Sequence, residues 1–182
     1  MFSNTTGSFN TGTGISALFS NTTGTLNTAT GVQALQNNTT GGSNTATGSQ
    51  ALQSNTTGRF NVANGNLALF SNTIGENNTA VGAAALLSNT EGGSNTANGD
   101  GALANNTTGH DNTANGLEAL FTNTTGSENT ADGEMRCKST PPATLTQPSV
   151  RMRFFRTLPA AAISLWAFKP ARMSPRPIKL FA

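Results

Sequence analysis

The sequence predicts an all-β repeat protein, a β-solenoid or β-roll built from coils of 17 residues. Three motifs that recur with this period support the prediction. Asn-Thr-Thr-Gly, or a variant that differs at one residue, begins at Asn4, Asn21, Asn38, Asn55, Asn72, Asn89, Asn106 and Asn123. Asn-Thr-Ala-x-Gly, in most copies, begins six residues later, and Ala-Leu follows it. A fixed period of this kind is typical of folds in which each unit stacks on its neighbours.

Within each coil, the motifs predict two short strands and a turn. Two glycines and several Asn and Thr residues per coil make a helical unit unfavourable. Asn-Thr-Ala-x-Gly predicts one extended run, as in residues 27–31, and the residues around Ala-Leu predict a second, as in residues 32–36. Asn-Thr-Thr-Gly predicts a turn whose glycine takes a positive φ. The predicted turn glycines are Gly7, Gly24, Gly41, Gly58, Gly75, Gly92, Gly109 and Gly126.

Two apolar columns are candidates for the core. Because side chains alternate across a strand, the leucines of Ala-Leu are expected to form an inward ladder. They are Leu18, Leu35, Leu52, Leu69, Leu86, Leu103 and Leu120, and a thinner alanine ladder comprises Ala29, Ala46, Ala63, Ala80, Ala97, Ala114 and Ala131. The position after each leucine holds Phe19, Gln36, Gln53, Phe70, Leu87, Ala104 or Phe121. That mixed column is expected to border solvent or a partner chain.

One coil buries too little apolar surface to offset the conformational entropy of ordering 17 residues. Backbone ladders, stacked Asn and Thr side chains, and burial against other chains must supply the rest. We therefore expect the array to be stable only as an oligomer. A homotrimer is the predicted state, since three thin rolls can share one apolar seam.

The chain divides at Gly133 into two parts of opposite charge. Residues 1–133 hold one basic and seven acidic residues, a net charge of −6, whereas residues 134–182 hold nine basic and one acidic, a net charge of +8. The overall charge of +2 describes neither part, so nucleic-acid binding is not predicted. No basic segment with an apolar run precedes the first repeat, so no secretory signal is predicted.

Residues 134–182 form a basic, Pro-rich tail that is expected to be irregular. Read in a shifted frame, their codons permit further Ala-Leu and Asn-Thr-Thr-Gly motifs in phase with the array. We infer that one base is missing near the codons for Gly133 and Glu134. The tail would then be out-of-frame repeat sequence without a native fold.

No group of residues predicts catalysis, a cofactor or a metal site. Cys137 and His110 are the single cysteine and histidine, so neither an intrachain disulfide nor a histidine-based site is available. The acids of the array occupy scattered columns, whereas calcium-binding solenoids need Asp at a fixed place. The apolar stretch over residues 158–168 is too short to span a bilayer. We expect a non-enzymatic chain without cofactor, metal or membrane span.

The repeat resembles a known family. Units such as Asn78-Thr79-Ala80-Val81-Gly82 with Ala85-Leu86 resemble the head repeats of trimeric autotransporter adhesins, and similar units occur in phage tail-fibre-like proteins. The resemblance covers residues 1–133. It implies a left-handed, trimeric parallel β-roll on a cell or virion surface, working as a stalk or adhesive head that binds a host or another surface.

The leading expectation for function is therefore a structural and adhesive segment of a surface fibre. The exposed column expected to face the target comprises Ser8, Thr25, Gly42, Arg59, Glu76, Gly93, His110 and Ser127. A phage tail-fibre segment is the alternative. An ice-binding solenoid, with ladders such as Thr22, Thr39, Thr56 and Thr107, is disfavoured because Thr-x-Thr pairs are not expected to repeat on one strand face. The strict phase argues against an unstructured low-complexity chain.

Overall fold

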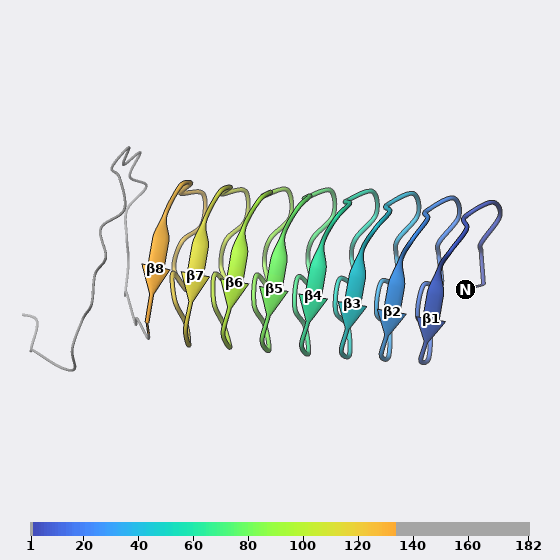
Figure 1. Cartoon of the computed structure of the whole chain (residues 1–182), viewed down its shortest axis with the longest axis horizontal. Helices are drawn as coiled ribbons and strands as arrows, with labels where there is room; N and C mark the ends of the chain where they lie inside the picture. The colour runs from blue at the N-terminus through green and yellow to red at the C-terminus, as the bar shows by residue number, and fades with distance from the viewer. Residues whose placement is uncertain (1, 134–182) are drawn as a thin grey trace, which may run out of the picture.

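The computed structural model describes residues 2–133, and these residues form a parallel β-solenoid (Figure 1). Eight strands of three residues each lie side by side in chain order in one parallel sheet. They are β1 (Thr11–Thr13), β2 (Thr28–Thr30), β3 (Thr45–Thr47), β4 (Val62–Asn64), β5 (Thr79–Val81), β6 (Thr96–Asn98), β7 (Thr113–Asn115) and β8 (Thr130–Asp132). Each residue of β1 to β7 pairs with the residue 17 positions later, as Ala29 does with Ala46. The predicted all-β repeat class is confirmed.

The hypothesis of an unstructured low-complexity chain is wrong for residues 2–133. The proposals about the tail, including its irregularity, its shifted frame and Cys137, concern residues 134–182 and lie outside the described residues.

The prediction of two strands per coil is wrong, because the coil contains one. The segment around Ala-Leu forms turns instead, and its leucines take left-handed backbone conformations, with φ of 50° at Leu35 and 53° at Leu69. Gln33, two residues before Leu35, is also left-handed, with φ of 59°. Side-chain alternation along a strand is therefore not what turns Leu35 inward. Sharp turns at left-handed residues do so, and they let a coil of 17 residues close on itself.

Left-handed residues recur in three columns, and within residues 2–133 none of the 21 non-glycine residues with positive φ is Val, Ile or Thr. Threonine is abundant in this chain, so its exclusion from these columns is informative. A branched Cβ clashes with the backbone in the left-handed region. The composition of these turns thus follows from backbone sterics.

The predicted apolar ladders lie in the interior. Leu18, Leu35, Leu52, Leu69, Leu86 and Leu103 are fully buried, as are Ala29, Ala46, Ala63, Ala80, Ala97 and Ala114. Leu120 and Ala131, near the end of the described array, are partly buried and pack against this core. Gly12 takes the place of the alanine in β1. Full burial of each leucine contributes about 2 kcal/mol to stability.

A second alanine column also lies inside the coil, beside the leucines. It comprises Ala17, Ala34, Ala51, Ala68, Ala85, Ala102 and Ala119. The Ala-Leu motif therefore contributes both of its side chains to the core. Only a small side chain fits beside leucine in so thin a roll.

Two columns of buried asparagines complete the interior, although neither was predicted to lie in the core. One runs through Asn21, Asn38, Asn55, Asn72, Asn89 and Asn106, and the other through Asn27, Asn44, Asn61, Asn78, Asn95 and Asn112. In the first column each amide nitrogen donates both to the preceding asparagine and to a glycine carbonyl, as Asn55 Nδ2 does to Asn38 Oδ1 (2.7 Å) and to the Gly58 carbonyl (3.0 Å).

The second column bonds to the backbone as well as to itself. Asn44 Nδ2 donates to the carbonyl of Gly58 at 2.9 Å, and the backbone N–H of Asn44 donates to Asn27 Oδ1 at 3.0 Å. Within residues 2–133 no buried side-chain nitrogen or oxygen lacks a hydrogen-bond partner. The asparagine ladders therefore cross the core without an unsatisfied polar atom, which would otherwise cost about 1–3 kcal/mol.

The glycines predicted to need positive φ do not have it. In Asn-Thr-Thr-Gly the glycine is required for space: a Cβ on Gly75 would lie 2.5 Å from the carbonyl oxygen of Gly92 and would clash with Asn72 Oδ1. Positive φ belongs instead to the glycine that closes Asn-Thr-Ala-x-Gly, such as Gly65 at 145°. The coil therefore needs glycine for two separate reasons, close backbone approach in Asn-Thr-Thr-Gly and positive φ in Asn-Thr-Ala-x-Gly.

Candidate binding surfaces

The outer faces of the coil carry the side chains that differ between repeats. The column predicted to face a target, from Ser8 through Arg59 to Ser127, is exposed or half-exposed along its whole length. Its residues change from coil to coil in size and charge, whereas the asparagine, alanine and leucine columns inside barely change. A binding partner of this array would therefore contact variable side chains that are supported by the same interior in every coil.

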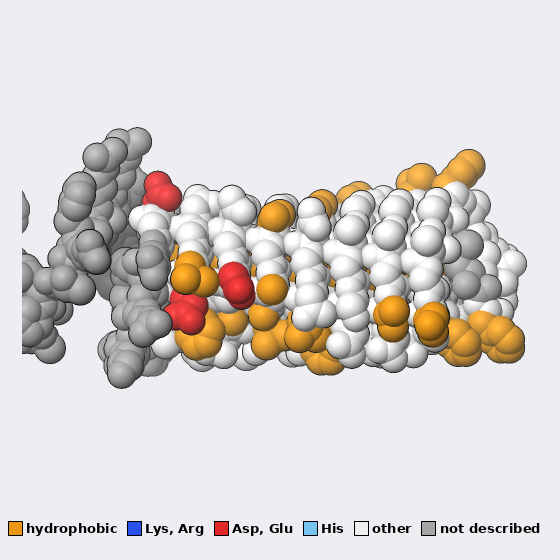
Figure 2. Space-filling model, turned by 90° about the horizontal axis from the view of Figure 1, so that it is seen from below, with side chains coloured by type: hydrophobic (Ala, Val, Ile, Leu, Met, Phe, Trp, Pro, Cys, Tyr) orange, Lys and Arg blue, Asp and Glu red, His pale blue; other side chains and the backbone are white. Residues whose placement is uncertain are grey.

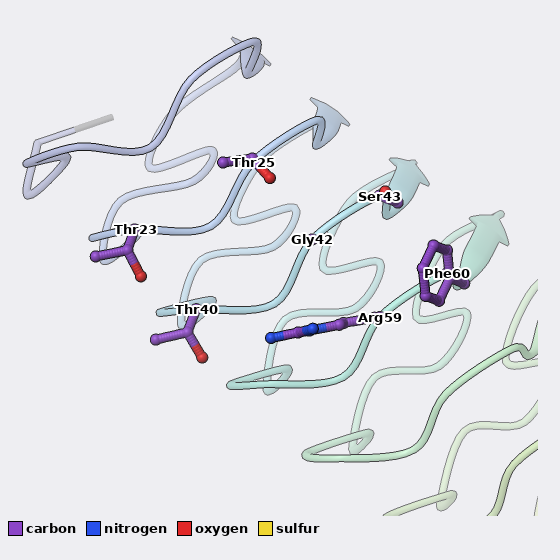
Figure 3. Close-up of a pocket in the computed structure, with 7 residues that line it drawn as sticks. All are labelled: Thr23, Thr25, Thr40, Gly42, Ser43, Arg59 and Phe60. Carbon is purple, nitrogen blue, oxygen red and sulfur yellow. The ribbon is translucent and has the colours of Figure 1, made fainter.

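A shallow hollow of about 360 Å³ lies on this column (Figure 3). It forms where Gly42, which has no side chain, stands between larger residues of the neighbouring coils. Figure 3 shows the Arg59 side chain extending toward Thr40 across the hollow, with the Phe60 ring on the other side of the Arg59 backbone. The lining residues are Thr23, Thr25, Thr40, Gly42, Ser43, Arg59 and Phe60. A guanidinium group, an aromatic ring and hydroxyls can together bind a polar or anionic group.

Charge is distributed unevenly along the array. The acidic residues all follow Arg59, from Glu76 to Asp132. Figure 2 shows acidic side chains toward the β8 end of one face and none over its N-terminal half. His110 Nδ1 lies 2.8 Å from Asp111 Oδ2, with both side chains more than half exposed. Solvent screens such a pair, so it contributes little to stability.

The mixed column after each leucine lies mostly at the surface. Phe19 is exposed, and its ring stacks on Phe2 with centroids 5.2 Å apart. Gln36 and Gln53 interrupt the aromatic residues and bond to each other, Gln53 Nε2 donating to Gln36 Oε1 at 2.8 Å. Ala104 alone in this column is buried. The column therefore offers two separate apolar stretches and no continuous apolar seam.

In the threonine ladder considered for ice binding, the hydroxyls are already bonded to the backbone of the next coil. Thr22 Oγ1 donates to the carbonyl of Thr39, and Thr39 Oγ1 to that of Thr56, each at 3.0 Å. The backbone N–H groups of Thr22, Thr23 and Gly24 converge on the same Thr39 carbonyl, at 3.0, 3.1 and 3.1 Å. Thr107 repeats the arrangement with Thr124. These threonines hold adjacent coils together.

The expectation that Thr-x-Thr pairs do not repeat on one strand face is wrong. Strands β1, β2 and β3 read Thr-Gly-Thr, Thr-Ala-Thr and Thr-Ala-Thr, and both threonines of each strand are exposed. Their register is Thr11 with Thr28 and Thr45, and Thr13 with Thr30 and Thr47. Alternation along Asn-Thr-Ala-x-Gly would have revealed them, because an inward alanine requires outward neighbours.

Among the described residues, no three His, Cys, Asp or Glu side chains lie close enough together to hold a metal ion. Residues 2–133 contain no helix with the length and apolar character needed to cross a bilayer.

The fold defines the chain as a repeat protein of the parallel β-solenoid class. Comparison with known proteins found no matching protein-family model, curated protein or solved structure.

Proposed function

We propose that the array is a non-catalytic structural and adhesive segment of a surface fibre, the head or stalk of a cell-surface adhesin that binds a host or another surface. The observation that supports this proposal is the separation between a constant interior and a variable exterior. Asn38, Leu35 and Ala34 are fully buried, whereas Arg59 and Glu76, which share one column, are exposed and of opposite charge. Such a rod sets a length and displays many weak contact points.

Multivalency explains how weak contacts could suffice. The hollow beside Arg59 is shallow, and the column on which it lies presents one exposed or half-exposed residue in each coil. When many such contacts act on one rigid support, the effective concentration of each after the first is high, so avidity exceeds the affinity of any one. A homotrimer would multiply the contacts further, and the exposed Phe2 and Phe19 are candidates for its seam.

The proposed location is a cell surface or the extracellular space, or a virion if the alternative, a phage tail-fibre segment, is correct. Both assignments use the same rod, so the array does not favour one over the other. Sequencing the gene together with its flanks would separate them, because the neighbouring domains would be a membrane anchor in one case and a fibre assembly domain in the other.

Adhesion under flow tests the proposal. Beads coated with the full chain should resist detachment from glass or from cell monolayers, and a variant that lacks one complete coil, residues 55–71, should fold and bind more weakly. Sedimentation velocity on the same preparation should give a trimer. Monodisperse monomers whose beads detach as readily as beads coated with serum albumin would contradict the proposal.

A further inference from the structure

Six exposed threonines form a regular grid at the N-terminal end of the sheet. Strands β1, β2 and β3 each contribute two, and the parallel register aligns them in two rows, Thr11, Thr28, Thr45 and Thr13, Thr30, Thr47. No hydroxyl of these six has a hydrogen-bond partner within residues 2–133, in contrast to the hydroxyl of Thr22. Each threonine therefore presents a methyl and a free hydroxyl outward.

The grid has a defined spacing and a rigid support. Neighbouring parallel strands lie about 4.8 Å apart, and alternate residues along a strand about 6.6 Å apart. Behind the grid, Ala29 and Ala46 are fully buried, and the asparagine before each strand is held by the ladder, as Asn44 is by Asn27 at 3.0 Å. The positions of the hydroxyls are consequently set by the backbone of the solenoid.

The surroundings of the grid are uncharged. No Lys, Arg, Asp or Glu occurs between residues 2 and 58. Exposed apolar side chains precede and follow the first two strands, with Phe9 and Ile15 around β1 and Leu26 and Val32 around β2. In later strands the same outward positions hold other residues, among them Val62 and Asn64 in β4 and Asp132 in β8. The Thr-x-Thr grid is thus confined to β1–β3.

We propose that this threonine face binds a crystalline surface of water, that is, ice. A lattice offers hydroxyl partners at fixed repeats in two directions, and a rigid grid with fixed repeats in two directions can engage several of them at once. Removal of water from the methyl groups between the hydroxyls adds a favourable free energy of binding. A protein partner fits the face less well, because six equal side chains offer neither a protruding anchor nor a pocket for one. This activity does not depend on the adhesive function proposed above.

The test is partition of the fluorescently labelled full chain into a slowly growing ice hemisphere, with labelled serum albumin as reference. Thr30→Lys places a long charged side chain in the middle of the grid, and the exposed Thr96→Lys on β6 is the matched control. Circular dichroism and thermal midpoints establish that both variants keep the strand signal. We expect the unmodified chain and Thr96→Lys to enter the ice, and Thr30→Lys to lose most of its ice-bound fraction.

Three outcomes would overturn the proposal: exclusion of the unmodified chain to the same extent as albumin, equal retention of Thr30→Lys and the unmodified chain, or equal loss in both lysine variants. Should Thr30→Lys unfold, Thr28→Asn, which removes a methyl and keeps a polar group of similar size, provides the second test, with Thr113→Asn on β7 as its control. Binding of the unmodified chain to polysaccharide beads but not to ice would assign the face to a carbohydrate.

Discussion

Asn38 Nδ2 donates a hydrogen bond of 2.8 Å to Oδ1 of Asn21, its counterpart one coil earlier, and a second of 3.0 Å to the carbonyl of Gly41 in its own coil. The first hydrogen bond ties the coil of Asn38 to the preceding coil, and the second closes the turn within the coil of Asn38. The second donor site of the amide would otherwise stay unpaired in a buried position, at a cost in stability. The interior of this solenoid is therefore held by an amide network as well as by its leucines.

Replacement of a ladder asparagine should destabilise the array strongly. Asn72→Ala removes the partner of Asn55 Oδ1, of the Gly75 carbonyl and of Asn89 Nδ2. We expect a loss of about 3 kcal/mol or more in the free energy of unfolding, measured by urea titration. The exposed Asn66→Ala is the control and should lose less than about 1 kcal/mol. Equal losses in the two variants would contradict a structural role for the ladder.

The leucine ladder can be tested with two leucines that share a backbone conformation. Leu69 is fully buried and Leu26 is 57% exposed, while both are left-handed, with φ of 53° and 60°. Leu69→Ala should cost about 2–5 kcal/mol because it leaves a cavity in a thin core. Leu26→Ala should change stability by less than about 0.5 kcal/mol. Thermal melts followed by circular dichroism compare the two, and a similar fall in both would point to backbone effects.

Two glycine substitutions should act in opposite directions. A Cβ on Gly75 meets the Gly92 carbonyl at 2.5 Å, so Gly75→Ala should force adjacent coils apart and lower the thermal midpoint. A Cβ on Gly12 meets its nearest atom, the Ala17 carbonyl oxygen, at 3.4 Å, in the column that holds alanine in β2 and β3. Gly12→Ala should therefore stabilise the chain by about 0.5–1 kcal/mol. A destabilised Gly12→Ala variant would contradict the assigned alanine column.

The left-handed columns should reject branched side chains. Ser94 is exposed with φ of 57°, and Asn77 occupies the equivalent position one coil earlier. Ser94→Val should cost about 1–2 kcal/mol, because a branched Cβ clashes in this conformation, whereas Ser94→Asn should be neutral or slightly stabilising. Guanidinium titration of both variants measures the difference. A neutral Ser94→Val would show that this turn relaxes out of the left-handed region.

Resequencing across the codons for Gly133 and Glu134 tests the frame hypothesis. We expect one additional base, after which the reading frame continues into further Ala-Leu and Asn-Thr-Thr-Gly motifs in the 17-residue phase. An unchanged sequence would contradict this hypothesis, and the basic tail would then belong to the protein.

Much of the fold could be predicted because stacking constrains each column separately. The period, the inward leucines and the alanines of Asn-Thr-Ala-x-Gly are visible as repeated letters, and each has a single plausible physical reason in a stacked coil. The prediction of a second strand in each coil was wrong because two structures share one sequence pattern. Leu35 lies inside through a left-handed turn, and an inward leucine in a strand produces the same pattern of letters.

The binding surfaces were harder to predict. Thr22 and Thr28 are both threonines that follow an asparagine, yet Thr22 Oγ1 bonds to the next coil and Thr28 faces solvent. The two hydroxyls differ in whether a backbone carbonyl of the next coil lies within hydrogen-bonding distance, as the Thr39 carbonyl does for Thr22 Oγ1. The hollow beside Arg59 likewise requires side chains from three successive coils to meet around Gly42.

The period of 17, the stacking of like residues on like and the apolar ladders could be inferred from the repeated letters, because each column of a narrow core needs side chains of constant size. The folded coil was needed to tell which asparagines are buried, which glycines need space, which need positive φ, and which threonines have free hydroxyls. Asn, Gly and Thr serve equally well in solvated turns and in buried ladders, and the carbonyl of the adjacent coil selects between the two.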